Sequence, residues 1–283
     1  MRSDPRDETV RSIGRLGYHR IAYRDWGDPA APVVFCVHGL SRNSRDFDPL
    51  ASELSAWRRV VCPDLVGRGK SDWLADPSDY HLIQYNLDMT VLAARIGVEQ
   101  FDWIGTSLGG LMGIALAGIP GSPIRRLVVN DIAPEVPTSA LRRLALYLGV
   151  DRTFPDLEAV EAHLRETLAP FGPMTATDWR RMAETGVMKV RQGYRLAYDP
   201  GIAQNFRRFW LPLNANLWRY WDKITCPVLI LRGAESDFLT TLLLDRMTRR
   251  LPHVDVVEFE GVGHTPTLNA PNQIAPVVEW LRQ

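Results

Sequence analysis

The stretch that decides the fold is residues 101–110, Phe101-Asp102-Trp103-Ile104-Gly105-Thr106-Ser107-Leu108-Gly109-Gly110. It reads as an apolar strand that passes through a sharp Gly-x-Ser-x-Gly turn into a helix, with Ser107 at the apex. The flanking Gly105 and Gly109 are needed in such a turn because a Cβ there would clash. The pattern alone is weak evidence, since chance supplies it in roughly one chain in ten of this length. The rest of the chain must decide whether Ser107 is a nucleophile or only a helix N-cap.

The composition is that of an ordinary globular protein, with 46% hydrophobic residues in a chain of 283, which is long enough to bury a large core. Lys plus Arg and Asp plus Glu each number 33, so no overall field points to nucleic acid or to an anionic membrane. We therefore expect a small, largely neutral partner molecule, and the sequence leaves the oligomeric state open.

The three cysteines, Cys36, Cys62 and Cys226, lie in or beside apolar runs without Cys-x-x-Cys spacing. Reduced, buried thiols are the expected state, rather than a disulfide or a metal site. Residues 1–14 are polar and lack the apolar region of a signal peptide, and no run approaches the ~20 apolar residues of a membrane span. These features predict a cytoplasmic protein.

Apolar runs alternate with helical patterns along most of the chain. The predicted strands cover residues 18–24, 33–37, 59–63, 101–106, 124–130, 228–231 and 254–259, and the predicted helices cover 46–54, 80–96, 107–117, 242–250 and 272–281. In the second helix, Ile83, Leu87, Val91 and Ile96 recur at helical spacing, and Gly97 is the expected C-cap. The alternation predicts an α/β fold with a doubly wound, mostly parallel sheet.

The alternation stops between residues 134 and 222, where the sequence becomes helical and is interrupted by prolines. We expect a core domain of residues 1–133 and 223–283 and an inserted helical cap of residues 134–222. Trp210, Trp218 and Trp221 are expected to pack the cap against the core, with substrate contact as the alternative. A loose basic series is expected to form a solvated helix face, with recognition of an acidic substrate as the alternative: Arg191, Arg195, Arg207 and Arg208.

Candidate catalytic residues follow the predicted strands, where ligands of open α/β sheets bind. A serine needs a base to remove its proton, and His264, on a glycine-flanked loop, suits that role. Asp237 follows the preceding strand and is the expected carboxylate partner of His264, with Asp131, which also ends a strand, as the alternative. The order of Ser107, Asp237 and His264 is that of serine hydrolases.

Attack by Ser107 on a carbonyl would create an oxyanion. The backbone N–H of Leu108, at the start of a helix, and that of Leu40, in the loop after residues 33–37, are the expected donors to it. His38 is expected to support this loop together with Gly39. The remaining histidines show no metal-ligand spacing, and the chemistry requires no cofactor or metal.

Taken together, these residues resemble the α/β-hydrolase superfamily, in its capped, serine-esterase-like branch, over about residues 15–283. The resemblance lies in the following motifs: His38-Gly39, Asp64-x-x-Gly67-x-Gly69-x-Ser71, Gly105-x-Ser107-x-Gly109, Asp237 and Gly263-His264. It implies that the cap lies between strands six and seven of the sheet.

The resemblance also narrows the chemistry. Haloalkane dehalogenases and epoxide hydrolases carry an aspartate at the position of Ser107, which disfavours both. Meta-cleavage-product hydrolases, which split carbon–carbon bonds, usually carry a tryptophan after the catalytic histidine, where this chain has Thr265. We therefore predict a serine hydrolase that cleaves a small carboxylic ester through an acyl-enzyme. Carbon–carbon hydrolysis and a ligand-binding protein without activity are the alternatives.

Overall fold

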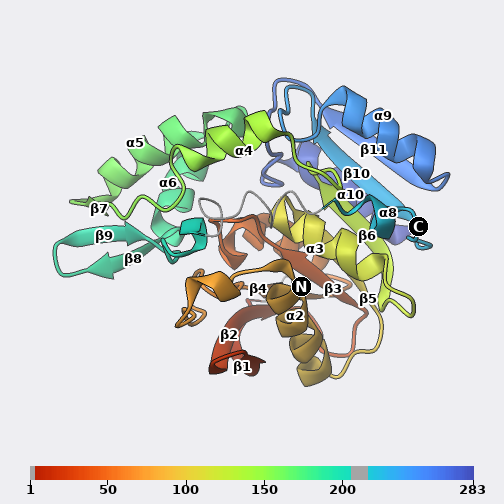
Figure 1. Ribbon diagram of the computed structural model, residues 1–283, viewed down its shortest axis with the longest axis horizontal. Coiled ribbons are helices and arrows are strands. Elements are labelled where there is room, and N and C mark those ends of the chain that lie inside the picture. Colours follow the sequence, from red (N-terminus) through yellow and green to blue (C-terminus); the bar gives the residue numbers. More distant parts are fainter. Residues whose placement is uncertain (1–3, 205–215) are drawn as a thin grey trace.

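The computed structural model describes residues 4–204 and 216–283. Within them, the main sheet has eight strands in the order β1-β2-β4-β3-β5-β6-β10-β11 (Figure 1). The strands are β1 (Arg6–Gly14), β2 (Gly17–Trp26), β3 (Val33–Val37), β4 (Arg59–Pro63), β5 (Phe101–Thr106), β6 (Ile124–Asn130), β10 (Val228–Gly233) and β11 (Val254–Phe259). Only the pairings of β2 with β1 and with β4 are antiparallel. The predicted α/β fold with a mostly parallel sheet is confirmed.

The amino-terminal edge of the sheet differs from the prediction. We expected a polar leader and one short edge strand, whereas β1 and β2 form a long antiparallel hairpin. Most side chains of β1 are exposed, and of its residues only Val10 and Ser12 are buried. The backbone of β1 is fully paired with β2, but its sequence is polar. It therefore has no apolar run by which a strand could be predicted.

Helices cover both faces of the sheet. Side chains of Val33, Phe35 and Val37 pack on one face, in a core shared with α2 (Leu82–Ile96), α3 (Leu108–Ala117) and α9 (Thr241–Arg250). Those of Val34 and Cys36 pack on the other face, with α1 (Asp48–Leu54) and α10 (Pro271–Arg282). Because successive strand residues face opposite sides, a strand buried on both sides must be continuously apolar, as β3 is.

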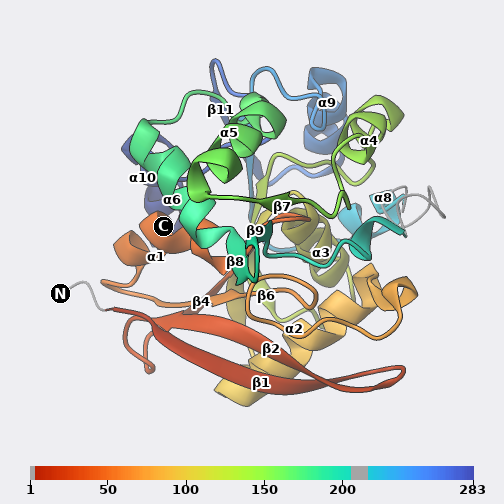
Figure 2. The same cartoon turned by 90° about the vertical axis from the view of Figure 1, so that its left-hand side faces the viewer.

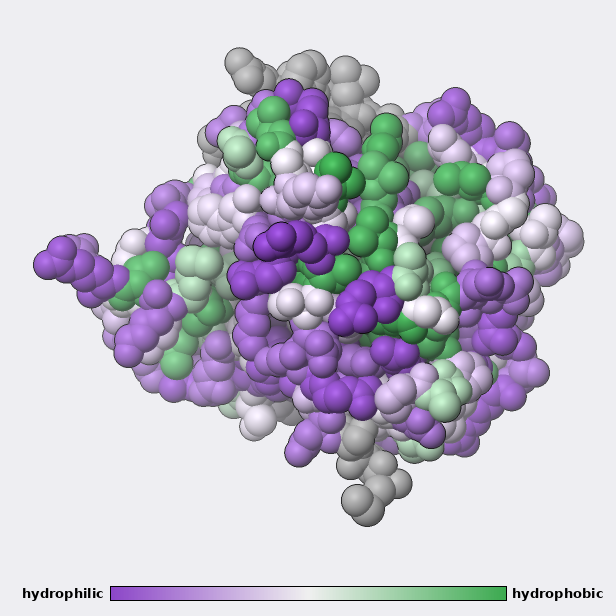
Figure 3. Space-filling view, turned by 90° about the horizontal axis from the view of Figure 1, so that it is seen from below, coloured by the Kyte–Doolittle hydropathy of each residue, from purple (hydrophilic) through white to green (hydrophobic). Residues whose placement is uncertain are grey.

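Helix α2 occurs where it was predicted and ends at Gly97, whose φ of 74° is left-handed. Its predicted apolar face is wrong, because Ile83 is 70% and Leu87 51% exposed. The buried face instead includes Tyr85 and Met89. Exposed hydrophobic residues are not unusual on this protein: the face seen from below shows them among hydrophilic ones (Figure 3). Helical spacing alone therefore identified the helix but not its orientation.

The segment between β6 and β10, the sixth and seventh strands of the main sheet, is not wholly helical. It contains α4 (Thr138–Ala145), α5 (Leu157–Thr167), α6 (Ala176–Thr185) and α8 (Trp218–Trp221), and also a second sheet of β7 (Thr153–Phe154), β9 (Gly193–Leu196) and β8 (Val187–Val190). Helices α5 and α6 share a small core of their own, which includes Val160 and Trp179. Figures 1 and 2 show α4, α5 and α6 above the strands of the main sheet.

The aromatic and basic residues singled out in this segment have different positions. Trp218 and Trp221 are buried in the core beside α3, as expected of packing residues. Arg195 lies on β9 and Arg191 in the turn before it, so these two do not form a helix face. Trp210, Arg207 and Arg208 lie outside the described residues.

Cys36 and Cys62 are buried and Cys226 is half-buried, and all three thiols are free. None of the described helices has the length and apolar character needed to cross a membrane.

Candidate active site

Ser107 occupies the sharp turn between β5 and α3, with φ 52° and ψ −110°. A positive φ is strained for a residue with a side chain and is held here by the surrounding packing. A Cβ on Gly105 would lie 2.2 Å from the Gly109 carbonyl oxygen, and one on Gly109 would lie 2.1 Å from the Val37 carbonyl oxygen. Both glycines are therefore sterically required, which agrees with the reading of the Gly-x-Ser-x-Gly turn.

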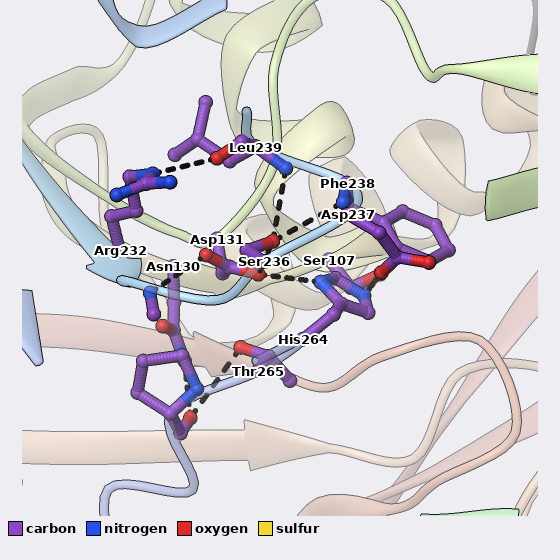
Figure 4. Close-up of polar contacts among 12 residues, drawn as sticks. Ser107, Asn130, Asp131, Arg232, Ser236, Asp237, Phe238, Leu239, His264 and Thr265 are labelled. Atoms are coloured by element: carbon purple, nitrogen blue, oxygen red, sulfur yellow. Dashed lines mark hydrogen bonds and ion pairs between the residues drawn. The ribbon is translucent and has the colours of Figure 1, made fainter. Parts of the chain in front are cut away.

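The imidazole of His264 lies between a serine and a carboxylate (Figure 4). Its Nε2 is 3.0 Å from the Ser107 Oγ, and its Nδ1 is 2.7 Å from the Asp131 Oδ2. An ionised carboxylate can only accept, so Nδ1 carries a proton, and the Nε2 of the neutral ring then accepts from the Ser107 hydroxyl. This arrangement can remove a proton from Ser107.

The predicted pairing of His264 with Asp237 is wrong, and the alternative, Asp131, is the residue in contact. Asp131 follows β6 directly, has a left-handed φ of 57°, and is fully buried. Asp237 lies four residues beyond the end of β10, and its side chain is 40% exposed. It accepts two hydrogen bonds from Arg143 of α4, at 2.8 and 2.9 Å. The loop after β10 thus directs Asp237 toward the inserted segment and away from the imidazole.

Two further donors hold the Asp131 carboxylate. The Gly233 N–H donates to Oδ1 at 2.9 Å, and the Ser236 hydroxyl donates to Oδ2 at 2.6 Å. Ser236 in turn accepts from the backbone N–H groups of Phe238 and Leu239. The Ser236 side chain therefore ties the β10 loop to Asp131. Sequence reasoning missed it, since a single serine in a polar loop gives no signal.

Phe238 is a second residue that the sequence did not reveal. Its ring stacks on the His264 imidazole, with centroids 3.8 Å apart and planes inclined by 14°. The side chain is buried and covers one face of the ring. Such stacking restricts rotation of the imidazole, so Phe238 helps to orient it toward Ser107.

The loop after β3 lies beside Ser107. His38 is fully buried, with its Nδ1 2.7 Å from the Gly39 carbonyl oxygen and its Nε2 accepting from the Leu65 N–H at 2.9 Å. Burial lowers the pKa of His38 to about 4, so the ring is neutral at physiological pH. A Cβ on Gly39 would lie 3.6 Å from the Ser107 Cβ, in ordinary contact. His38 thus fixes the loop that approaches the serine.

Of the two expected oxyanion donors, Leu40 lines the same cavity as Ser107, and Leu108 follows Ser107 directly in the chain. The Leu40 N–H shares its peptide unit with the Gly39 carbonyl, which lies 2.7 Å from the His38 Nδ1, and the next carbonyl, that of Leu40, accepts from the Nε of the buried Arg68 at 2.8 Å. Leu108 is the first residue of α3, where a helix leaves backbone N–H groups without intrahelical acceptors. In the described residues, no acceptor is found for either N–H group.

A cavity opens above Ser107. Its lining includes Leu40, Ser107 and His264 from the core and Leu144, Phe171 and Met182 from the inserted segment, and it is mostly apolar. In the part of the chain that the structure describes, no group of three or more His, Cys, Asp or Glu side chains could hold a metal ion.

Comparison with known proteins agrees with the fold. Residues 33–277 match the model of the alpha/beta hydrolase family. The chain is 45% identical to a 3-hydroxybutyrate-oligomer hydrolase of Cupriavidus necator, over 97% of each chain. Its fold is similar to an alpha/beta hydrolase from Novosphingobium aromaticivorans (TM-score 0.88, 36% identity, 99% of each chain) and a putative hydrolase from Rickettsia typhi (TM-score 0.91, 28% identity, 99% of each chain). The protein therefore belongs to the alpha/beta hydrolase family.

Proposed function

We propose that this protein is a serine hydrolase that cleaves carboxylic esters, with Ser107 as nucleophile, His264 as general base and acid, and Asp131 as orienting carboxylate. The observation that carries the proposal is the position of the His264 ring within hydrogen-bond distance of both the Ser107 hydroxyl and the buried Asp131. This is the arrangement by which a serine is activated at neutral pH.

In the acylation step, the Ser107 Oγ attacks the ester carbonyl carbon while its proton passes to the His264 Nε2. The Asp131 carboxylate stabilises the imidazolium that forms. The negative charge on the carbonyl oxygen is stabilised by the N–H groups of Leu40 and Leu108, each such donor contributing about 10²- to 10³-fold in rate. The ester C–O bond then breaks, and His264 returns the proton to the leaving alkoxide, which departs as an alcohol.

Deacylation repeats the sequence with water as the nucleophile. His264 removes a proton from the water, whose oxygen attacks the acyl carbon, and then protonates the Ser107 Oγ as the acid product leaves. We further propose that residues 134–222 act as a cap on this site, because Leu144 and Met182, from two of its helices, line the cavity above Ser107.

For the substrate, we propose short oligomers of 3-hydroxybutyrate. The support is the relative named as a 3-hydroxybutyrate-oligomer hydrolase, which is 45% identical over nearly the whole chain. These oligomers are linear carboxylic esters of a small hydroxy acid, so their hydrolysis uses the steps above without a cofactor. The mostly apolar lining of the cavity suits their methyl and methylene groups.

The test is hydrolysis of the 3-hydroxybutyrate dimer and trimer by the purified protein, with p-nitrophenyl butyrate as a simple ester. Ser107→Ala should lower turnover of all three by about 10⁶-fold, judged from the serine of an analogous triad. Labelling by a fluorophosphonate should also be lost in that variant. Turnover by Ser107→Ala within tenfold of the parent would disprove the nucleophile, and a parent that cleaves only the simple ester would disprove the substrate.

A further inference from the structure

The cavity above Ser107 has a charged end. Its lining contains three arginines, Arg42, Arg45 and Arg181, and one aspartate, Asp46. Arg42, Arg45 and Asp46 come shortly after Leu40, in the segment that follows β3, whereas Arg181 lies on α6 of the inserted segment. Arg42 is paired with Asp46 and Arg45 with Asp48, so among these arginines Arg181 is the one without a close counter-ion in the part of the chain that the structure describes.

Arg42 is buried, with 7% of its surface exposed, and only some of its N–H donors form hydrogen bonds. Its Nε and Nη2 donate to the two oxygens of Asp46 at 3.0 and 2.7 Å. Its Nη1 lies beside the end of α6, since a Cβ on Gly186 would be 3.0 Å from it. Within residues 4–204 and 216–283, Nη1 has no hydrogen-bond acceptor. A buried guanidinium thus keeps donor capacity at the edge of the cavity.

Arg181 is paired more weakly. Its guanidinium is 3.8 Å from the Asp178 Oδ1, and no nearer carboxylate is found for it in the described part of the chain. Asp178 also caps α6, where its Oδ2 accepts from the backbone N–H and hydroxyl of Thr175. The side chain of Arg181 is 27% exposed, so it is partly removed from solvent without having a close counter-ion.

The adjacent Arg180, on the same helix, is paired at the surface. It binds Glu158 at 2.7 Å and Glu184 at 3.0 Å, is 40% exposed, and does not line the cavity. Both of its carboxylate partners are on the outside of the inserted segment. Arg181 therefore differs from Arg180: Arg181 lines the cavity, whereas Arg180 forms ion pairs at the surface.

We propose that Arg181 and Arg42 form a subsite for a free carboxylate of the substrate. This inference rests on the proposed function and deepens it, because an oligomer of a hydroxy acid has a carboxylate at one end. A guanidinium binds a carboxylate through two parallel N–H···O bonds, which an ester or a neutral alcohol cannot accept with the same strength. In a dimer, the carboxylate belongs to the leaving alcohol, so the subsite orients the leaving group during acylation.

The experiment compares each acid with its neutral ester. The ratio of kcat/KM for the 3-hydroxybutyrate dimer to that for its methyl ester is measured in the parent, Arg181→Gln and Arg180→Gln. We expect Arg181→Gln to lower the ratio about 10- to 100-fold, the usual range for a hydrogen bond to a charged group. Arg180→Gln is the matched control and should keep the ratio of the parent. Arg181→Lys, which retains the charge without the paired donors, should give an intermediate ratio.

Two additional measurements separate this proposal from the proposed function. 3-Acetoxypropionate and its methyl ester form a second acid and ester pair, in which the carboxylate also lies on the leaving alcohol. This pair tests the subsite even if the hydroxybutyrate dimer is not a substrate. In Ser107→Ala protein, calorimetry with the dimer should show a Kd about tenfold lower than in Ser107→Ala/Arg181→Gln. A parent that cleaves only the acetoxypropionate pair would count against the proposed substrate alone. Equal ratios in Arg181→Gln and Arg180→Gln for both pairs, or equal Kd values, would overturn the subsite.

Discussion

Replacing Asp131 by Asn tests the identity of the catalytic carboxylate. The Oδ1 of Asp131 accepts from the Gly233 N–H, and its Oδ2 accepts from Ser236 and faces the His264 Nδ1. If the oxygen of an asparagine amide remains at the Gly233 N–H, its NH₂ group replaces Oδ2. Since an NH₂ group only donates, His264 must then lose the proton from Nδ1 and carry it on Nε2, which can no longer accept from Ser107.

The expected loss follows from this change of tautomer. In an analogous triad the same substitution keeps the geometry and lowers kcat about 10⁴-fold, which corresponds to about 5.5 kcal/mol of transition-state stabilisation. The matched control is Asp237→Asn, which breaks a partly exposed ion pair with Arg143. A pair of that kind contributes about 0–1 kcal/mol to stability, so the variant should stay folded. Because Asp237 binds Arg143 and it is Asp131 that meets His264, kcat should change by less than about threefold.

The assay is steady-state hydrolysis of p-nitrophenyl butyrate, because a neutral substrate avoids any effect of charge on binding. Thermal unfolding of both variants shows whether each remains folded at the assay temperature. A larger loss of kcat in Asp237→Asn than in Asp131→Asn would refute the reasoning. So would full activity of a folded Asp131→Asn protein.

Three further predictions concern the surroundings of the site. Ser236→Ala should lower kcat about 10-fold, because Asp131 loses a charge-assisted donor, and unchanged steady-state kinetics would contradict this. His38 should lower the unfolding free energy by about 2.5 kcal/mol from pH 6.5 to pH 4, because the unfolded chain protonates this histidine first. Denaturant titrations of His38→Gln should lack this contribution, and an equal dependence of the unfolding free energy on pH in both proteins would exclude it. Gly105→Ala should destabilise the fold by at least about 2 kcal/mol in the same titrations, since its Cβ meets a backbone oxygen, and an unchanged midpoint would contradict the clash.

Much of the fold could be predicted from the chain because the main strands are apolar on both faces. The predicted bounds of β3, β4, β6 and β11 match the structure. In β3 and β4, burial on both sides makes each strand a continuous apolar run with a clear end, whereas β11, at the edge of the sheet, is mostly exposed. Strand β1 was missed for the opposite reason, because most of its side chains face solvent and its place depends on backbone pairing with β2.

Ser107 and His264 could also be found from local sequence. A serine in a turn that excludes any Cβ on its neighbouring glycines leaves a pattern in the chain itself. A histidine on a glycine-flanked loop after the last strand does so as well. The hydrogen-bond distance between the two residues agrees with the prediction that they act together.

Only the tertiary structure decided which carboxylate meets His264 and which arginines face the cavity. Asp131 and Asp237 both follow strands, and the difference between them lies in the loop after β10, which directs Asp237 to Arg143 and Ser236 to Asp131. Arg180 and Arg181 are adjacent in the chain, yet the turn of α6 places one on the surface and the other at the cavity. Backbone sterics leave a local pattern in a sequence, whereas the direction of a polar side chain depends on partners that are distant in the chain.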